Sequence, residues 1–357
     1  MTNLERKLLS PAQLGDITLS NRIVMAPMTR SRAIGNVPND LMATYYSQRA
    51  TAGLIITEGV SPSVNGLGYS RIPGIYTDAQ VAGWKKITHA VHEKNGRIFI
   101  QIMHTGRVAH PGNLPEGGKV VGPSAVAAPG DMWVDAAGMQ PMPVPESVKT
   151  EQIPDLINEY VNAARNAMEA GFDGVEIHAA NGYLPMQFLN PAANKREDQY
   201  GGSAENRNRF VLELTAAVAE AIGKNKVGIR LSPFNPFNGL SPATDEAEQY
   251  KLLVKGLKNI GVVYVHLLTF AMPPELTDEL HAIFGSPFIL NGGYTAERAE
   301  TDLNNNRAEL ISFGGPFIAN PDLVERFETG AGLAVPDQSL FYTPGAEGYT
   351  DYSSLNA

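Results

Sequence analysis

The chain has 357 residues, of which 43% are hydrophobic and 18% charged, and this composition is typical of a globular protein with a sizeable core. Its 28 Lys and Arg against 37 Asp and Glu give a net charge of -9, so we expect no nucleic-acid partner. The absence of cysteine excludes disulfides, thiolate nucleophiles and iron–sulfur ligation. The amino-terminal segment has no long apolar stretch and no later run matches a membrane span, so we expect a soluble, cytoplasmic protein without a membrane partner.

Short runs of apolar and β-branched residues recur along the chain and predict strands that are buried on both faces. There are eight such runs: Arg22–Met25, Leu54–Glu58, Arg97–Ile102, Gly174–His178, Val227–Leu231, Val262–Leu267, Pro287–Leu290 and Leu310–Phe313. Segments with helical spacing follow them: Asp40–Ala50, Asp78–Lys94, Ile153–Ala170, Ala204–Ile222, Asp245–Ile260, Pro274–Phe284, Thr295–Asn304 and Pro321–Thr329. We expect Asp78 to be an N-cap, Pro274 and Pro321 to lie in first turns, and Gly171 and Gly261 to follow last turns.

Eight strand and helix pairs in a chain of this length predict a single α/β domain over residues 1–357, folded as a (β/α)8 TIM barrel. The segment LGDITLSNR before the first strand predicts a hairpin that caps the lower end of the barrel. Residues 107–148, after the third strand, are rich in Pro and Gly and too long for an ordinary loop. We expect this excursion to form a lid over the barrel mouth.

Polar residues stand at the carboxyl ends of the predicted strands, where TIM barrels build their sites. They are Thr29, Glu58, Gln101, His104, His178, Asn181, Tyr183, Arg230, Ser232, His266 and Asn291. Two glycine pairs, Gly292–Gly293 and Gly314–Gly315, follow strands seven and eight, where exposed N–H groups often bind a phosphate. Ordinary tight turns are the alternative reading of these glycines.

Three of these side chains suit a carbonyl group. His178 and Asn181 offer hydrogen bonds to its oxygen, and Tyr183 offers a proton to a carbanion or enolate. The alternative is a hydrogen-bonded barrel histidine and a packing tyrosine. Arg230 lies in an apolar strand and needs a partner, either an anionic or polar ligand or an ion pair with Glu176 or Glu58. No HExxH spacing is present, so we expect no metal site.

Five segments together resemble the Old Yellow Enzyme family of flavin-dependent ene-reductases, and they span nearly the whole chain. They are NRIVMAPMTRSRA (21–33), RIFIQIMHTGRVAHP (97–111), HAANGYLPMQFLNPAANKREDQYGGSAENRNRF (178–210), FGGPFIANPDL (313–323) and FYTPGAEGYTDY (341–352). The sequence looks most similar to the N-ethylmaleimide reductase branch of that family.

The resemblance implies an enzyme in which NADPH, or NADH, reduces bound FMN and is then replaced by an electron-poor alkene. Substrates of this family include α,β-unsaturated carbonyls, maleimides and nitroalkenes, and no obligate protein partner is implied. Hydride passes from flavin N5 to the β-carbon while His178 and Asn181 hold the substrate oxygen. Tyr183 then protonates the α-carbon.

The resemblance also assigns residues to the cofactor and substrate. Flavin contacts are implied for Pro27, Met28, Thr29, Gly59, Gln101, His178 and Arg230. Thr29 is implied to tune the redox potential of the flavin. Phosphate contacts are implied for Asn291, Gly292, Gly293, Gly314 and Gly315. Besides His178, Asn181 and Tyr183, the substrate-binding candidates are Tyr69, Met103, Phe270 and Tyr342.

Two positions depart from the family pattern. Gly315 stands where an arginine is expected to bind the FMN phosphate, so we expect weaker and more salt-sensitive FMN binding. The alternative function is therefore a flavin-binding barrel with weakened or lost turnover. Met103 stands where a tryptophan is common, which indicates either a roomier pocket or simple repacking.

Overall fold

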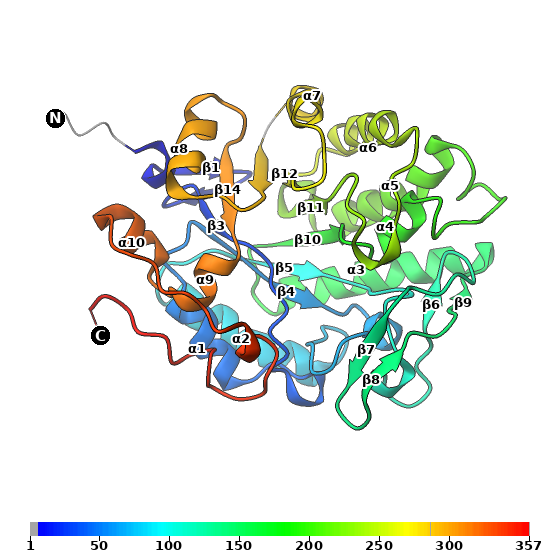
Figure 1. The fold of residues 1–357 in the computed structure, drawn as a ribbon, viewed down its shortest axis with the longest axis horizontal. Coiled ribbons are helices and arrows are strands. Elements are labelled where there is room, and N and C mark those ends of the chain that lie inside the picture. Colours follow the sequence, from blue (N-terminus) through cyan, green and yellow to red (C-terminus); the bar gives the residue numbers. More distant parts are fainter. Residues whose placement is uncertain (1–5, 286, 357) are drawn as a thin grey trace.

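The computed structural model describes residues 6–285 and 287–356, and in it eight parallel strands close into a barrel (Figure 1). The strands are β3 (Ile23–Met25), β4 (Leu54–Val60), β5 (Ile98–Ile102), β10 (Gly174–Ala179), β11 (Val227–Leu231), β12 (Tyr264–Leu268), β13 (Phe288–Asn291) and β14 (Leu310–Phe313). They pair in chain order, and β14 pairs with β3 to close the ring. The predicted TIM barrel is confirmed. We expect no secretion signal in the amino-terminal segment. Residues 1–5, with which this segment begins, lie outside the described residues.

Helices surround the barrel at the predicted places, with ends that shift by a few residues. They are α1 (Asp40–Gln48), α2 (Asp78–His92), α3 (Ile153–Glu169), α5 (Ala204–Ile222), α6 (Glu246–Ile260), α7 (Pro274–Phe284), α8 (Ala296–Asn304) and α10 (Leu323–Thr329). Two short helices were not predicted, α4 (Leu184–Leu189) and α9 (Gly315–Ala319). All six residues of α4 are buried, so its sequence shows no polar face that would mark a helix. Across the described ranges, no helix combines the length and apolarity that a membrane crossing requires.

The helix ends correct two of the expected termini. The N-cap of α2 is Thr77 and not Asp78, because Thr77 has extended backbone angles and its hydroxyl accepts the N–H of Gln80. The Gln80 side chain accepts the N–H of Thr77 in return, which completes a capping box. Pro321 precedes α10 by two residues, so it lies outside the first turn. Pro274 does begin α7, and Gly261 ends α6 in the left-handed conformation with φ of 84°.

The barrel interior is apolar at its lower end and polar above it. The hairpin of β1 (Ala12–Leu14) and β2 (Ile17–Leu19) packs under the barrel against Leu54, Phe99 and Ile289, which confirms the predicted cap. Higher up, the Glu176 carboxylate on β10 lies 2.8 Å from His266 Nδ1 on β12. Because β11 separates these two strands, the contact must cross the barrel interior. A polar layer therefore lies directly below the carboxyl ends of the strands.

Two segments outside the barrel reach its mouth. The excursion after β5 contains the parallel pair β6 (Val121–Gly122) and β9 (Glu146–Ser147) and a hairpin of β7 (Asp131–Val134) and β8 (Gly138–Pro141). The carboxyl-terminal tail runs over α1 and α2 (Figure 1). Buried Arg32 holds this tail by donating to the carbonyls of Phe341 at 2.6 Å and Leu340 at 2.9 Å. Tyr349 stacks on Tyr45 with ring centroids 4.0 Å apart.

Removal of the α2 cap tests the corrected helix start. We expect Thr77→Ala to destabilise the protein by about 1 kcal/mol, because the N–H of Gln80 loses its acceptor. Thr77→Ser keeps the hydroxyl and is the matched control. The measurement is the thermal unfolding midpoint of each variant, and an equal drop for both would show that the methyl group matters rather than the cap.

Candidate active site

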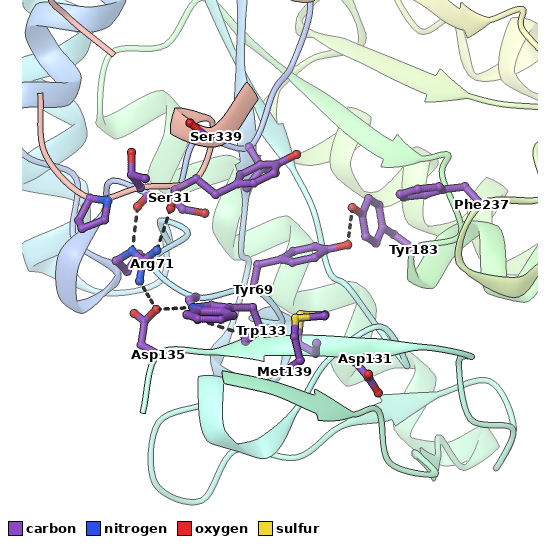
Figure 2. Close-up of a pocket in the computed structure, with 16 residues that line it drawn as sticks. Ser31, Tyr69, Arg71, Asp131, Trp133, Asp135, Met139, Tyr183, Phe237 and Ser339 are labelled. Carbon is purple, nitrogen blue, oxygen red and sulfur yellow. Dashed lines mark hydrogen bonds and ion pairs between the residues drawn. The ribbon is translucent and has the colours of Figure 1, made fainter. Parts of the chain in front are cut away.

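A cavity of about 640 Å³ opens at the carboxyl ends of the barrel strands, which is the size of a small-molecule site (Figure 2). Its wall combines the loops after β3 and β4, the hairpin of β7 and β8, the start of α4, the loop after β11 and the tail. The lining residues are Thr29, Ser31, Tyr69, Ser70, Arg71, Asp131, Met132, Trp133, Asp135, Met139, Tyr183, Phe237, Ser339, Tyr342, Thr343 and Pro344. Four of the predicted site residues thus share this cavity: Thr29, Tyr69, Tyr183 and Tyr342.

Tyr183 lies at the N-cap of α4 and presents its phenol to this cavity. Its hydroxyl is 3.0 Å from that of Tyr69, and Figure 2 shows the two side chains meeting. The ring also contacts His178 edge to face, with centroids 4.8 Å apart. Burial raises the pKa of Tyr183 well above its usual value, and the neighbouring Tyr69 raises it further. The phenol therefore holds its proton at neutral pH.

His178, on β10, has a defined charge and tautomer. Burial lowers the pKa of His178 well below its usual value, and the charge of Arg230 lowers it further. The imidazole is therefore neutral. Its Nδ1 accepts the backbone N–H of Ala180 at 3.3 Å, so the single ring proton lies on Nε2. His178 is thus a fixed neutral hydrogen-bond donor.

Asn181 is held at three points. Its backbone is in the left-handed region with φ of 55°, and its N–H donates to Ser232 Oγ at 2.8 Å. Its side-chain oxygen accepts from Asn235 Nδ2 at 2.9 Å, so the NH₂ group is the part of this amide that is left to donate. Its carbonyl accepts from Asn238 at 2.8 Å. Sequence reasoning missed Asn235 and Asn238, although the loop NPFNG after β11 carries the asparagines that such turns favour.

Arg230 is buried without enough partners of its own. Its Nη2 donates to Asn291 Oδ1 at 3.0 Å, whereas Nε and Nη1 have no hydrogen-bond partner among the described residues. Neither of the expected acids pairs with it in that part of the chain. Glu176 instead contacts His266 and Gln101, and Glu58 contacts Tyr46 and the N–H of Arg30. Two buried donors at this place call for an acceptor from a ligand.

The two glycine pairs, for which phosphate contacts stay a prediction, directly follow the ends of β13 and β14. Gly292 and Gly293 both have positive φ, 153° and 65°, and a Cβ on Gly292 would meet Thr269 Oγ1 at 2.5 Å. Gly314 lies against Met28, and Gly315 begins α9. A Cβ placed on Gly315 has no heavy atom within 4 Å, so there is open space where the family pattern predicts an arginine.

The remaining predicted residues lie around the cavity without lining it. Met103 is buried, and its side chain packs against Gly59 and into a cluster with Tyr183. Phe270 is 73% exposed on the loop after β12, next to Gly293. Gln101 is buried on Glu176 at 2.7 Å, and Pro27 is half-buried directly after β3. Their proposed contacts with cofactor or substrate stay predictions.

The cavity wall also contains residues that sequence reasoning missed. Arg71 has φ of 56° and joins three chain segments: it donates to the carbonyls of Ser31 at 3.1 Å and Tyr342 at 2.8 Å and pairs with Asp135. Trp133 donates its indole N–H to the same Asp135 at 3.0 Å. The two carbonyl contacts of Arg71 link residues 40 and 271 positions apart, so no local sequence pattern could reveal them.

Comparison with known proteins identifies the family to which this geometry belongs. Residues 7–333 match the model of the NADH:flavin oxidoreductase / NADH oxidase family. The chain belongs to this family. A probable flavin mononucleotide-dependent alkene reductase of Leishmania infantum is 42% identical over 97% of this chain and 96% of its own. The 12-oxophytodienoate reductase 1 of Oryza sativa subsp. japonica is 41% identical over 98% of this chain and 93% of its own.

Solved structures agree with this assignment. Morphinone reductase in complex with tetrahydroNAD superposes with a TM-score of 0.93 at 46% identity, covering 98% of this chain and 97% of that one. The old yellow enzyme homologue from Zymomonas mobilis gives a TM-score of 0.94 at 41% identity, covering 97% and 99%. The Old Yellow Enzyme family and an oxidoreductase function are therefore confirmed. Membership of this family implies that the protein uses FMN and a nicotinamide reductant. Its assignment to the N-ethylmaleimide reductase branch stays a prediction.

Glu58 gives the site a pH-dependent stability. Burial raises the pKa of Glu58 to about 7, although the N–H of Arg30, next to Thr29, partly opposes the rise. Because this pKa lies above that of the unfolded chain, the contribution is fully present below pH about 4.5 and lost as pH rises through about 7. We expect the unfolding midpoint to fall between pH 5 and pH 8 by an amount equivalent to about 3 kcal/mol. Glu58→Gln, which cannot ionise, flattens this fall, and an unchanged slope in the variant would contradict the assignment.

Proposed function

We propose that this protein is an FMN-dependent NAD(P)H oxidoreductase that reduces the activated C=C bonds of α,β-unsaturated carbonyls, maleimides and nitroalkenes. The observation that carries the proposal is the donor set between the end of β10 and the start of α4. Tyr183 lines the cavity with a protonated phenol, and its ring contacts that of neutral His178, which carries its proton on Nε2. Two residues before Tyr183, the side-chain oxygen of Asn181 is engaged by Asn235, so its NH₂ group is the part left to donate. Family membership supports the same conclusion.

The residues present fit FMN. The unpartnered Nε and Nη1 of Arg230 suit the polar edge of a flavin ring, and the glycine cradle of β13 and β14 suits its phosphate. Pro27, Met28, Thr29, Gly59 and Gln101 complete the proposed ring site, with Asn291 beside Arg230. When bound, FMN supplies two-electron chemistry, taking hydride from a nicotinamide and giving it to the alkene.

His178 and Asn181 are proposed to hold the substrate's carbonyl or nitro oxygen. Neither donor must reorganise, because each is fixed by bonds to the surrounding loops. Donors aimed at an oxygen that gains negative charge stabilise the transition state more than the ground state. A neutral imidazole donates without itself changing charge, so this contribution does not depend on pH near neutrality.

Tyr183 is proposed to give its proton to the α-carbon as the C=C bond is reduced. Its raised pKa keeps the proton in place until a strong base such as a carbanion forms beside it. Tyr69, 3.0 Å away, holds the phenol in position at the cavity wall. We further propose that the reductant is NADPH, with NADH as the alternative, and that the nicotinamide enters through the same cavity.

The second candidate function is a flavin-binding barrel with weakened or lost turnover. The open space at Gly315 favours it, because no side chain there neutralises the phosphate charge. The prearranged donors favour the enzyme, since a binding protein has no need of a proton donor beside an oxygen clamp.

The deciding experiment is anaerobic visible spectroscopy of the purified protein. We expect a bound flavin band that bleaches with NADPH and returns when 2-cyclohexenone is added. A parallel titration with NADH shows which of the two nicotinamides reduces the flavin. A protein that stays colourless and inactive after incubation with excess FMN would contradict the enzyme function and favour the second candidate.

Loss of the proton donor tests the role of Tyr183. We expect Tyr183→Phe to slow enone reduction by about 100-fold, the usual contribution of general acid catalysis, while reduction of the flavin by NADPH keeps its rate. Stopped-flow absorbance separates the two half-reactions. Tyr69→Phe is the comparison variant: it removes the hydroxyl that positions the donor and keeps the donor itself, so we expect a smaller loss than for Tyr183→Phe. Equal losses in both half-reactions would point to a structural role instead.

Restoring the missing cation tests the phosphate cradle. We expect Gly315→Arg to tighten FMN binding about tenfold, because a guanidinium can fill the open space beside the cradle. Gly315→Ala adds no charge and serves as the control. Fluorescence titration of FMN into the apoprotein measures both constants. If Gly315→Arg binds FMN no more tightly than Gly315→Ala, the phosphate does not lie beside Gly315.

A further inference from the structure

Trp133 is the largest side chain of the cavity wall, and it faces the opening. It lies on β7, directly opposite Met139 on β8, and both are more than half exposed, at 52% and 57%. Both line the same cavity as Tyr69 and Tyr183 (Figure 2). The alternate residues of β7, Met132 and Val134, are buried, so the period of two places Trp133 on the exposed face of the hairpin.

The indole of Trp133 does not swing freely. Its N–H donates to Asp135 Oδ1 at 3.0 Å, and Asp135 is paired with Arg71. Arg71 is itself anchored to the carbonyls of Ser31 and Tyr342. The Trp133 carbonyl accepts from Asn113 at 2.8 Å and from Ser70, the neighbour of Tyr69, at 3.2 Å. Main chain and side chain are therefore both held beside the opening.

Holding Trp133 in this exposed position costs free energy, which indicates that the side chain has a functional role. An indole face exposed at a cavity opening gains little from burial, and Arg71 holds an unfavourable left-handed backbone with φ of 56°. The wall between Trp133 and Met139 is apolar and aromatic, which suits a flat apolar group.

We propose that Trp133 is a specificity-determining residue, positioned by Asp135 and Arg71, whose indole binds a flat aromatic or polycyclic substituent carried by the substrate outside its reacting alkene. The proposal rests on the function proposed above. The preferred substrates are then activated alkenes that carry a large planar apolar group, rather than small cyclic alkenes.

The test uses binding, so it does not depend on turnover. N-phenylsuccinimide and N-methylsuccinimide share the imide oxygens but lack the alkene, so neither can be reduced. We expect calorimetric titration of the FMN-loaded protein to show that Trp133→Ala weakens N-phenylsuccinimide binding about five- to tenfold and leaves N-methylsuccinimide unchanged. Trp133→Phe keeps an aromatic face and retains most of the affinity.

Two further variants separate positioning from disturbance of the hairpin. Asp135→Ala weakens the phenyl probe about threefold, and the double variant with Trp133→Ala is no weaker than Trp133→Ala alone, because Asp135 acts through the indole. Val144→Ala alters an exposed apolar residue of the same excursion that does not line the cavity, and it leaves both affinities unchanged.

The outcomes are distinct for the two proposals. Equal weakening of both probes by Trp133→Ala, or no weakening of either, overturns the role of Trp133. Steady-state kinetics with N-phenylmaleimide and N-methylmaleimide then tests its consequence, with KM for the phenyl substrate rising in Trp133→Ala and kcat unchanged. If the wild-type protein reduces neither maleimide, the proposed function fails, while the succinimide titrations still decide whether Trp133 binds the planar group.

Discussion

Closure of the parallel barrel is the constraint on which the rest of this structure depends. Once β14 pairs with β3, every strand is fixed in register, and alternate side chains must point into a common interior. That interior is sealed below by the β1–β2 hairpin, so polar groups are admitted only above the apolar layer. Glu176 and His266 form the first polar level, and His178 and Arg230 follow at the strand ends. The buried charge of Arg230 is tolerable there because the level below contains a carboxylate and the cavity above can supply an acceptor.

The site combines rigid and neutral donors with one unsatisfied cation. His178 is uncharged because burial and the nearby Arg230 both oppose a second positive charge. Asn181 is oriented by Ser232 and Asn235, so its direction is set by the loop after β11 and not by the substrate. Since these groups are held before any ligand arrives, little conformational entropy remains to be lost on binding. The proposed donors accordingly lie between the end of β10 and the start of α4, and the excursion contributes to the outer wall of the cavity.

The barrel and the inner site were predictable because their signals are local. Buried parallel strands are continuous apolar runs, and a polar residue that ends such a run is conspicuous, as His178 and Arg230 are. Helix α4 was missed because all its residues are buried, and Asp78 was mistaken for the cap because Thr77 and Asp78 are both good capping residues. The outer wall was predicted only in part, through Tyr69 and Tyr342. Arg71 joins Ser31, Asp135 and Tyr342 across segments far apart in the chain, and no periodicity records such contacts.

The anchoring of the tail has a consequence for the order in which the protein is made. Ser339 and Tyr342 line the cavity, yet they follow the last barrel strand by more than two dozen residues. Arg30 and Arg32, near the start of the barrel, can hold this tail only after it has left the ribosome. During synthesis the strands can pair and the inner donors can take their places while one side of the cavity is still missing. The outer wall of the cavity is thus completed only after all eight barrel strands have been made.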